Sequence, residues 1–383
     1  MEPVTTNLDQ LVVIGYGTVK RSDLTGSVST IKSEDFNPAE TGSVEGLIQG
    51  KLPGVRVVER SGAPGGGFGI SVRGASSITA GTGPLWVVDG SPLAGGLRTL
   101  NPDDIESIEV LKDASATAIY GSRGSGGVIM VTTKKGGNTP LSVNYHGAFG
   151  FSKPVNNIEL LSPEQYMQVT NEIIDAGGGN PEDRVESVGA ATDWMAEIFD
   201  PGASEQHHSL SFSGNMNGLG YYVSLNATNE NGVIKNSSFA RYGGRINLEY
   251  KGSDKFRFGT NLRLSHVEDQ LIRQGGVNEN AGAVYAALFF DPTLAIRDGQ
   301  GQFIESDQLT INNPVAILEG EDRTNNINLF AGNAYGEYSV TPHLKARVNV
   351  GFNIGNNKND SYIGRLTLVG RARGGVANID QNQ

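Results

Sequence analysis

The chain has 383 residues, no cysteine and a formal net charge of −11. The lack of thiols excludes a disulfide framework, a zinc site built on cysteines and a thiol nucleophile, and the acidic balance argues against a general nucleic-acid binder, which needs a basic face. The 53 glycines are about twice the usual share of roughly 7%, which predicts many tight turns and argues against a helical bundle.

The N-terminal ten residues, MEPVTTNLDQ, have neither the basic nor the apolar region of a signal peptide. They are followed by LVVIGYG (residues 11–17), in which four apolar residues precede Gly15, Tyr16 and Gly17. Such a segment is typical of a buried strand, and equally of a free segment that another protein adds to the edge of its own sheet. The residues alone leave both interpretations open.

Residues 25 to about 137 alternate quickly between strand and helix patterns. We expect strands in LPGVRVVE, GISVRGASS and PLWVVDGSPL, the last ending in a turn at Asp89 and Gly90. From residue 101 we expect a short helix (NPDDIES), a strand (IEVLK), a second short helix (ASATAIYG) and a final strand (GVIMVTTKK). Asn101 and Pro102 suit a helix start. The alternation is too rapid for a doubly wound sheet, so we predict an α+β domain.

Two patterns in this domain resemble chemical sites. Asp103 and Asp104 could supply paired carboxylates, but the helix dipole explains acidic residues at a helix start. The glycines of YGSRGSGG (120–127) lack the spacing and the lysine of a phosphate loop, so we expect a tight turn there. We therefore predict that the protein is not an enzyme and uses no cofactor.

From about residue 141 the pattern changes to the period of two that is typical of amphipathic strands. The clearest segment alternates Val348 and Val350 with Asn349. We expect eight strands, at 142–152, 208–216, 220–229, 240–250, 255–267, 327–340, 343–355 and, more weakly, 361–370. Long and short connections alternate strictly between them, which is typical of an outer-membrane β-barrel. A water-soluble sandwich or propeller, with its apolar face against a second sheet, is the alternative.

The two longest connections, 153–207 and 268–326, are the expected extracellular loops. Their candidates for stacking on a bound sugar are Tyr166, Trp194, Phe289 and Phe290. The first loop should contain a helix in SPEQYMQVTNEIIDAG, with Ser162 as the N-cap, so packing explains Tyr166 as well as binding does.

His207 and His208 could hold a metal ion. The sequence offers no cysteine and no third ligand at a useful spacing. We therefore expect a solvated loop at these histidines and predict no metal site.

The sequence resembles the TonB-dependent outer-membrane transporters, specifically the SusC/RagA branch found in Bacteroidetes. Over residues 8–137 the matching blocks are LVVIGYGTVKRSDLTGSVSTI, LIQGKLPGVRVVERSGAPGGGFGISVRGASSI, GPLWVVDGSPL and LNPDDIESIEVLKDASATAIYGSRGSGGVIMVTTKKG. Later stretches, such as ENGVIKNSSFARYGGRINLEYK, are similar to the first barrel strands of that branch. The resemblance covers nearly the whole chain.

The resemblance implies a plug inside a 22-stranded barrel in the outer membrane. TonB, energised through ExbB and ExbD, would pull on a short N-terminal segment, and a SusD-like surface lipoprotein would cover the barrel. Typical cargo of the branch is oligosaccharide; peptides, siderophores and other nutrients are alternatives. By resemblance the TonB-binding residues are Leu11, Val12, Val13, Ile14, Gly15, Tyr16 and Gly17. The plug signature is Arg73, Gly74, Asp89, Gly90, Tyr120, Gly121, Arg123, Gly126 and Gly127.

Two further expectations follow. Arg73 and Arg123 should pair with carboxylates such as Glu106, Glu109 or Asp113, either tying the plug to the wall or as ordinary surface pairs. The chain divides into an N-terminal stub with the TonB-binding segment and a tether (1–24), a plug (25–140) and the first part of a barrel (141–383).

The number of strands bears on what the chain can do alone. An eight-stranded barrel is filled by its own side chains and has no room for a plug, and an open sheet leaves unsatisfied edges in lipid. We therefore expect a fragment of an importer that does not transport by itself. A non-transporting binding protein of the outer membrane is the alternative.

Overall fold

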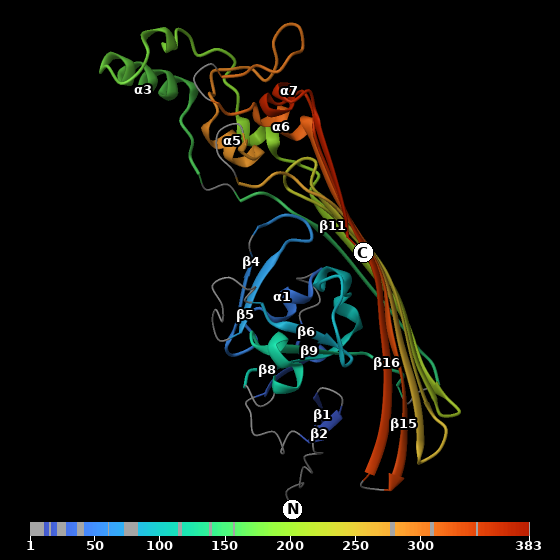
Figure 1. Ribbon diagram of the computed structural model, residues 1–383. Helices are drawn as coiled ribbons and strands as arrows, with labels where there is room; N and C mark the ends of the chain where they lie inside the picture. The colour runs from blue at the N-terminus through green and yellow to red at the C-terminus, as the bar shows by residue number, and fades with distance from the viewer. Residues whose placement is uncertain are drawn as a thin grey trace, which may run out of the picture.

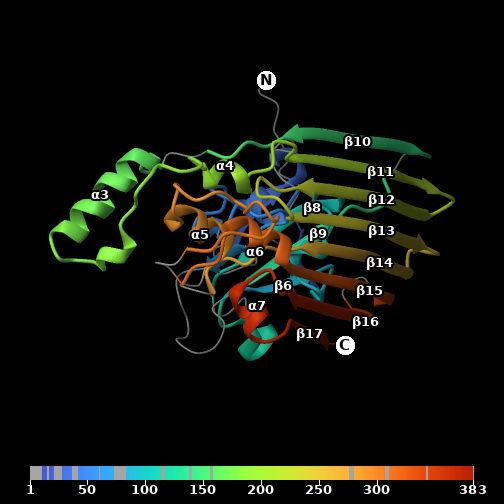
Figure 2. The ribbon, with the colours of Figure 1, turned by 90° about the horizontal axis from the view of Figure 1, so that it is seen from above.

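The computed structural model describes residues 11–14, 17–20, 28–36, 42–59, 61–72, 83–113, 117–137, 140–155, 158–275, 280–306, 310–341 and 344–382. An α+β domain (the plug, residues 28–137) lies against one face of a long curved antiparallel sheet (the wall, residues 142–382), as Figures 1 and 2 show. This arrangement confirms the predicted fold class of an α+β plug followed by antiparallel barrel strands.

The plug is built on a five-stranded sheet in the order β3-β8-β9-β6-β7. The central strands, β8 (Ile105–Leu111) and β9 (Val128–Thr133), are buried because one apolar cluster covers each face of the sheet. The remaining plug strands are β3 (Val28–Lys32), β6 (Leu85–Val88) and β7 (Ser91–Pro92), with a separate hairpin of β4 (Val55–Glu59) and β5 (Phe68–Val72). The helix α1 (Val44–Ile48) packs into the larger cluster.

The two short helices expected between the last plug strands are 3-10 segments. They are η4 (Pro102–Asp104) and η5 (Ala118–Gly124). Two further 3-10 segments, η2 (Ser33–Asp35) and η3 (Leu97–Thr99), lie elsewhere in the plug. The first helix was predicted too long, because Ile105 and Glu106 already belong to β8. Residues 114–116, at the start of the second predicted helix, lie outside the described residues.

An N-terminal hairpin precedes the plug. Its strands, β1 (Leu11–Ile14) and β2 (Gly17–Lys20), pair antiparallel with Leu11 opposite Lys20. In Figure 1 the hairpin lies at the end of the molecule where the wall strands are joined by short turns. The long loops lie at the opposite end.

The wall is an eight-stranded meander in which each strand pairs antiparallel with its neighbours in chain order. Its strands are β10 (Ser142–Phe151), β11 (Ser204–Met216), β12 (Leu219–Asn231), β13 (Ser238–Lys251), β14 (Phe256–Gln270), β15 (Glu321–Thr341), β16 (Leu344–Ile363) and β17 (Val376–Asn382). The two-residue turn between β11 and β12 uses Asn217 and Gly218, both with positive φ (53° and 84°), as a hairpin turn of type I′ requires.

Two expectations about the wall need correction. The eighth strand is β17 and does not lie at 361–370, where β16 ends and α7 (Leu368–Ala372) begins with the Thr367 side chain accepting a hydrogen bond from the Gly370 N–H (3.1 Å). Several strands also extend further toward the long loops than predicted; β15 begins at Glu321 and β11 at Ser204. These extensions are polar on both faces, so hydropathy does not reveal them.

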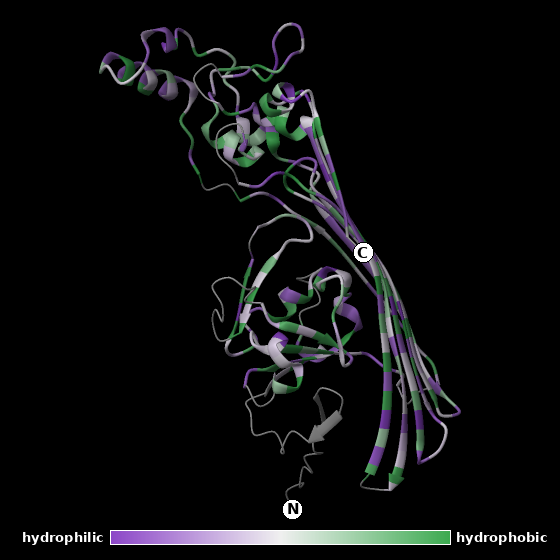
Figure 3. Cartoon of the chain, in the orientation of Figure 1, coloured by the Kyte–Doolittle hydropathy of each residue, from purple (hydrophilic) through white to green (hydrophobic). Residues whose placement is uncertain are grey.

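The wall has an apolar outer face and a polar inner face. Exposed apolar side chains include Val143, Phe151, Leu225, Ile246, Leu264, Val350 and Ile354, whereas the buried side chains facing the plug include Ser224, Thr228, Arg241, Arg245 and Asp269. Figure 3 shows the two kinds alternating along the strands. This polarity is the reverse of a water-soluble sandwich and suits strands whose outer face meets lipid.

The long loops fold into a helical cluster above the wall. Three short helices, α4 (Trp194–Ile198), α5 (Ala283–Phe289) and α6 (Pro314–Gly320), share one apolar core. The helix α3 (Pro163–Asp175) projects away from it (Figures 1 and 2), and η6 (Pro181–Asp183) follows. The predicted N-cap is confirmed: Ser162 Oγ accepts from the Gln165 N–H (3.2 Å). In the described part of the chain, no helix is both long and apolar enough to cross a membrane.

Candidate functional site at the interface between plug and wall

The turn between β6 and β7 carries Asp89 into the polar face of the wall. Asp89 and Gly90 both have positive φ (48° and 84°), and the carboxylate accepts hydrogen bonds from the Thr133 N–H (3.0 Å), the Thr133 hydroxyl (2.6 Å) and Arg245 Nη2 of β13 (2.8 Å). Asn261 of β14 donates a further bond. Burial alone would raise the pKa of Asp89, but the Arg245 charge and the Thr133 hydrogen bonds lower it below its ordinary value.

A bidentate ion pair joins η3 to β14. Arg98 donates from Nη1 and Nη2 to the two carboxylate oxygens of Asp269, at 2.6 Å each. The Asp269 side chain is fully buried and accepts a third bond from Asn325 (2.9 Å). The guanidinium carbon of Arg98 lies 5.3 Å from the centre of the Phe239 ring. Fork-to-fork contacts of this kind fix orientation as well as distance.

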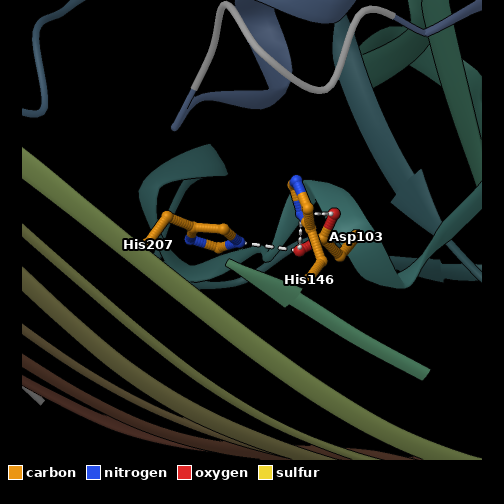
Figure 4. A group of neighbouring side chains, drawn as sticks. All are labelled: Asp103, His146 and His207. Atoms are coloured by element: carbon orange, nitrogen blue, oxygen red, sulfur yellow. Dashed lines mark hydrogen bonds and ion pairs between the residues drawn. The ribbon is translucent and has the colours of Figure 1, made fainter. Parts of the chain in front are cut away.

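The 3-10 turn η4 brings Asp103 between two histidines of the wall. Asp103 accepts from His207 Nε2 on β11 (2.7 Å) and lies 3.1 Å from His146 Nδ1 on β10, as Figure 4 shows. The other nitrogen of His207 contacts the Thr228 hydroxyl (2.9 Å). Burial alone would raise the pKa of Asp103, but the hydrogen bonds from the two histidines lower it to about 2.

The residues flanking Asp103 contact the wall as well. Tyr222 of β12 donates its hydroxyl to Asp104 (2.9 Å), and both side chains are buried. Asn101 donates to Ser209 of β11 (3.4 Å) and makes no cap bond to its own helical turn. One turn of the plug therefore presents several polar groups to successive wall strands. Asn101 occupies the expected N-cap position and Pro102 begins the turn, but the Asn101 side chain contacts the wall and does not cap the turn.

A cavity of about 320 Å³ lies between the plug and strands β11 to β13. At its edge the Gly65 N–H donates to Glu230 (2.7 Å), and Arg241 donates to the Gly42 carbonyl (3.2 Å). Gly65 has φ +58°, and a Cβ there would lie 2.2 Å from the Phe239 ring. Only glycine lets the plug backbone approach the wall this closely.

The predicted TonB-binding residues lie apart from this interface. Leu11, Val12, Val13 and Ile14 form β1, Gly17 begins β2, and Gly15 and Tyr16 fall outside the described residues. The backbone of β1 pairs with β2 and with no other strand of the part of the chain that is described. Its partner is therefore a local hairpin strand and not the plug sheet, and the TonB-binding role remains a prediction.

The plug-signature residues divide by role. Asp89 and Gly90 form the plug-to-wall turn, while Tyr120 donates its hydroxyl to the Met130 sulfur (3.7 Å) within the plug. Gly121 and Gly127 have positive φ (59° and 91°), and Gly126 precedes Gly127 in the same tight turn. Arg123 is exposed on η5. Arg73 and Gly74 fall outside the described residues, so the ion pairs predicted for the two arginines remain predictions.

The loop aromatics are divided between core and surface. Trp194 and Phe290 are 2% and 3% exposed and contact each other edge to face at 4.8 Å between ring centres, and Trp194 Nε1 donates to the Asp291 carbonyl (2.9 Å). These two side chains pack the loop core, so in this structure a sugar could not stack on them. Phe289 is 52% exposed and Tyr166 is half-buried, so both are accessible to a ligand.

The wall histidines also differ from expectation. His207 and His208 lie in β11 and not in a solvated loop; His207 points inward, and His208 Nδ1 lies 2.8 Å from the Tyr145 hydroxyl on the outer face. Strand alternation could have assigned His207 and Asp269 to the inner face. It could not reveal that Asp103 and Arg98 of the plug meet them, because those contacts span 104 and 171 residues.

Comparison with known proteins agrees with this architecture. The model of the TonB-dependent Receptor Plug Domain matches residues 20–128. TonB-dependent receptor SusC of Bacteroides thetaiotaomicron is 37% identical, over 91% of this chain and 37% of its own length. The chain belongs to the SusC/RagA-type TonB-dependent receptors. Its eight wall strands correspond to the early strands of the outer-membrane barrel of such receptors. The proteins of this family are not enzymes.

Two further relatives support the assignment. TonB-dependent receptor P26 of Formosa agariphila is 34% identical over 97% of this receptor chain and 38% of its own length. The RagAB peptide importer in its open-open state shares the fold, with a TM-score of 0.78 at 23% identity over 92% of this chain and 43% of that one. The chain thus spans less than half the length of the relatives that it matches.

Proposed function

We propose that this receptor chain is the coupling and gating part of a TonB-dependent importer that carries oligosaccharides across the outer membrane. The observation that carries the proposal is the polar interface between the plug and the wall. Arg98, Asp89 and Asp103 attach the plug to wall residues through hydrogen bonds and ion pairs, while the outer face of the same strands is apolar. Polar contacts can exchange with water when the plug is pulled, whereas an apolar interface would resist separation.

TonB is the proposed source of the pull. The β1 hairpin lies at the short-turn end of the wall (Figure 1), which is the periplasmic end in barrels of this kind. A strand with one unpaired edge binds a partner by adding to its sheet, with backbone hydrogen bonds supplying the affinity. We assign this role to residues 11–17, followed by the tether up to residue 24.

A SusD-like lipoprotein is the proposed partner at the opposite end. One of the solved structures of similar fold is that of the RagAB peptide importer. In this receptor, α3 carries no buried residue and projects from the loop cluster, which leaves it free to contact a second protein. Phe289 and Tyr166 are the accessible aromatics for cargo.

Coupling is tested in the whole receptor, expressed in a host strain that lacks its own copy. The double substitution Val12→Pro and Val13→Pro removes two backbone N–H donors from β1. It should abolish energy-dependent uptake and binding of the TonB C-terminal domain. The matched control, Thr18→Pro with Val19→Pro, breaks only the hairpin partner opposite these residues and should keep both activities. Equal loss in both variants would contradict the strand-addition proposal.

Cargo is tested in the same strains with oligosaccharides and with peptides as the sole carbon source. Receptor-dependent growth on oligosaccharides supports the proposal. If growth depends on the receptor only when peptides are supplied, the proposed cargo becomes peptide, and the proposal of TonB coupling still stands. A receptor that binds TonB but imports neither would favour the non-transporting alternative.

A further inference from the structure

Asp103, His146 and His207 place three metal-binding side chains at one point of the plug–wall interface. Among the described residues they form the one group of three such side chains whose ligand atoms all lie within 4.8 Å of one another. Each comes from a different element: Asp103 from η4, His146 from β10 and His207 from β11. Figure 4 shows both imidazoles directed at the same carboxylate.

The donor set is one that divalent transition metals prefer. Neutral imidazole suits Zn²⁺, Cu²⁺, Fe²⁺ and Ni²⁺, and a carboxylate with two histidines completes three positions of a four-coordinate zinc site, leaving one for water. Ca²⁺ and Mg²⁺ are disfavoured because they require oxygen ligands.

The geometry needs only a small adjustment to hold such an ion. Zn²⁺ binds nitrogen and oxygen at about 2.0–2.1 Å, so tetrahedral ligand atoms lie about 3.3 Å apart. Asp103 already lies 2.7 Å from His207 Nε2 and 3.1 Å from His146 Nδ1. The two histidine rings lie edge to face with their centres 5.6 Å apart. The ligand atoms all lie within 4.8 Å of one another, so the widest separation must close by at most about 1.5 Å for all three to bind one ion.

The surroundings leave space for an ion and carry both acidic and basic groups. A cavity of about 220 Å³ is lined by all three side chains, and Glu205 and Glu230 also line it. Lys134 is in the same lining, and the buried Arg241 guanidinium lies behind Thr228, so Asp103 and the two glutamates balance these cations. The cavity has room for the ion and for a water molecule in the fourth position.

A second layer of contacts orients one of the ligands. His207 uses Nδ1 to contact the Thr228 hydroxyl (2.9 Å), which directs Nε2 toward Asp103. Histidines that bind metals typically hold the other ring nitrogen in a hydrogen bond of this kind. Arg241 Nη2 donates to the same hydroxyl (3.1 Å) and so fixes its position.

We propose that Asp103, His146 and His207 form a binding site for a divalent transition-metal ion of the Zn²⁺ type that clasps the plug to the wall. The ion replaces hydrogen bonds across the interface by three coordinate bonds, so the plug separates from β10 and β11 less readily when the metal is bound. The site is independent of the cargo and of TonB, and it stands even if the proposed function fails.

The test uses the full receptor in detergent, purified with an affinity tag that contains no histidine and treated with a chelator. Co²⁺ is titrated as a spectroscopic probe, followed by competition with Zn²⁺. The wild type should bind one Co²⁺ with the visible absorption bands of a four- or five-coordinate ion, and Zn²⁺ should displace it. Thr228→Val, which removes a second-layer contact, should weaken Co²⁺ affinity roughly 10–100-fold. His207→Gln, which removes a ligand, should weaken it by more than that.

The matched control is His208→Gln. His208 neighbours His207 but lies on the outer face beside Tyr145, so Co²⁺ binding should be unchanged. His146→Gln and Asp103→Asn provide independent losses if His207→Gln fails to fold. Zn²⁺ should also slow hydrogen exchange in residues 102–111 of the wild type and not of Asp103→Asn. Absence of Co²⁺ binding by the wild type, or equal binding by the wild type and all three ligand variants, would show a hydrogen-bonded ion-pair cluster only and overturn the proposal.

Discussion

Arg98 of the plug and Asp269 of the wall form two parallel hydrogen bonds of 2.6 Å across 171 residues of sequence. The carboxylate is fully buried, while the guanidinium is 28% exposed. Plug and wall are therefore joined by a contact that is strong when closed and that water can reach from the arginine side. Such a contact holds a plug in place without making it a permanent part of the wall.

Loss of Arg98 should weaken this attachment. Arg98→Ala leaves the buried Asp269 carboxylate with the hydrogen bond from Asn325 but without its ion-pair partner. Removing one member of a buried ion pair typically costs about 2–5 kcal/mol. The readout is thiol labelling of a cysteine introduced at Ser209, which is buried beside Asn101; the 383 residues contain no other cysteine. In Arg98→Ala, labelling should begin at a lower urea concentration than in the Ser209→Cys receptor that retains Arg98.

The control for Arg98 is an exposed pair of the wall. Lys251 and Asp254 lie 3.1 Å apart in a short turn, with 53% and 96% of their side chains exposed. Lys251→Ala should shift the labelling midpoint by no more than a surface pair is worth, about 0–1 kcal/mol. Equal shifts in the two variants would mean that Arg98 does not hold the plug.

Asp89 should make plug attachment sensitive to acid. Its pKa is lowered in the folded protein, so its ionised form adds stability that is fully present above the unfolded value of about 3.9 and is lost as the pH falls through the folded value. At pH values below about 4, the urea concentration at the midpoint of Ser209→Cys labelling should therefore decrease. Asp89→Asn should lower the midpoint at pH 7 and reduce its further fall in acid.

Other carboxylates titrate in the same range, so the informative quantity is the difference between wild type and Asp89→Asn at each pH. Asp254→Asn, at a side chain that is 96% exposed, serves as the matched substitution and should leave the acid response unchanged. An Asp89→Asn receptor with the full acid response of the wild type would contradict the assignment.

Gly65 should not tolerate a side chain. Gly65→Ala combines a positive φ (+58°) with a Cβ placed 2.2 Å from the Phe239 ring, so the plug must shift away from β13. Gly50→Ala is the matched control, because Gly50 also has a positive φ (+71°) but has nothing within 4 Å of the added atom. We expect a cost of about 1 kcal/mol for Gly50→Ala from backbone conformation alone, and a clearly larger loss of urea resistance for Gly65→Ala.

Trp194 should stabilise the long loops above the wall. Trp194→Ala opens a cavity in the core of α4, α5 and α6, and truncation of a buried tryptophan typically costs about 3–5 kcal/mol. Limited proteolysis of intact cells should then cleave the loop between β14 and β15 faster. Phe289→Ala, at an exposed ring, should change the free energy of loop opening by about 0.5 kcal/mol or less, so the cleavage rate should change little. Unchanged cleavage of Trp194→Ala would show that the loops are held by other contacts.

The sequence identified the two parts of the molecule because each has its own period. Alternation in segments such as Val348, Asn349 and Val350 revealed the wall strands, and the lengths of the connections distinguished the two ends of the sheet. The N-cap at Ser162 was predictable because capping depends on neighbours three residues away. The eighth strand was misplaced because a polar strand and the Thr367-capped helix before it have no clear apolar period.

By itself, then, the sequence determined the family, the α+β plug, the order of the strands and the face of each strand that meets lipid, since all of these depend on local pattern. The tertiary structure alone decided that Arg98 meets Asp269, that Asp103 lies between His146 and His207, and that Trp194 is buried in a loop core. Those contacts join residues 43 to 171 positions apart, and their partners are selected by how the plug fits the curved wall, which no local period records.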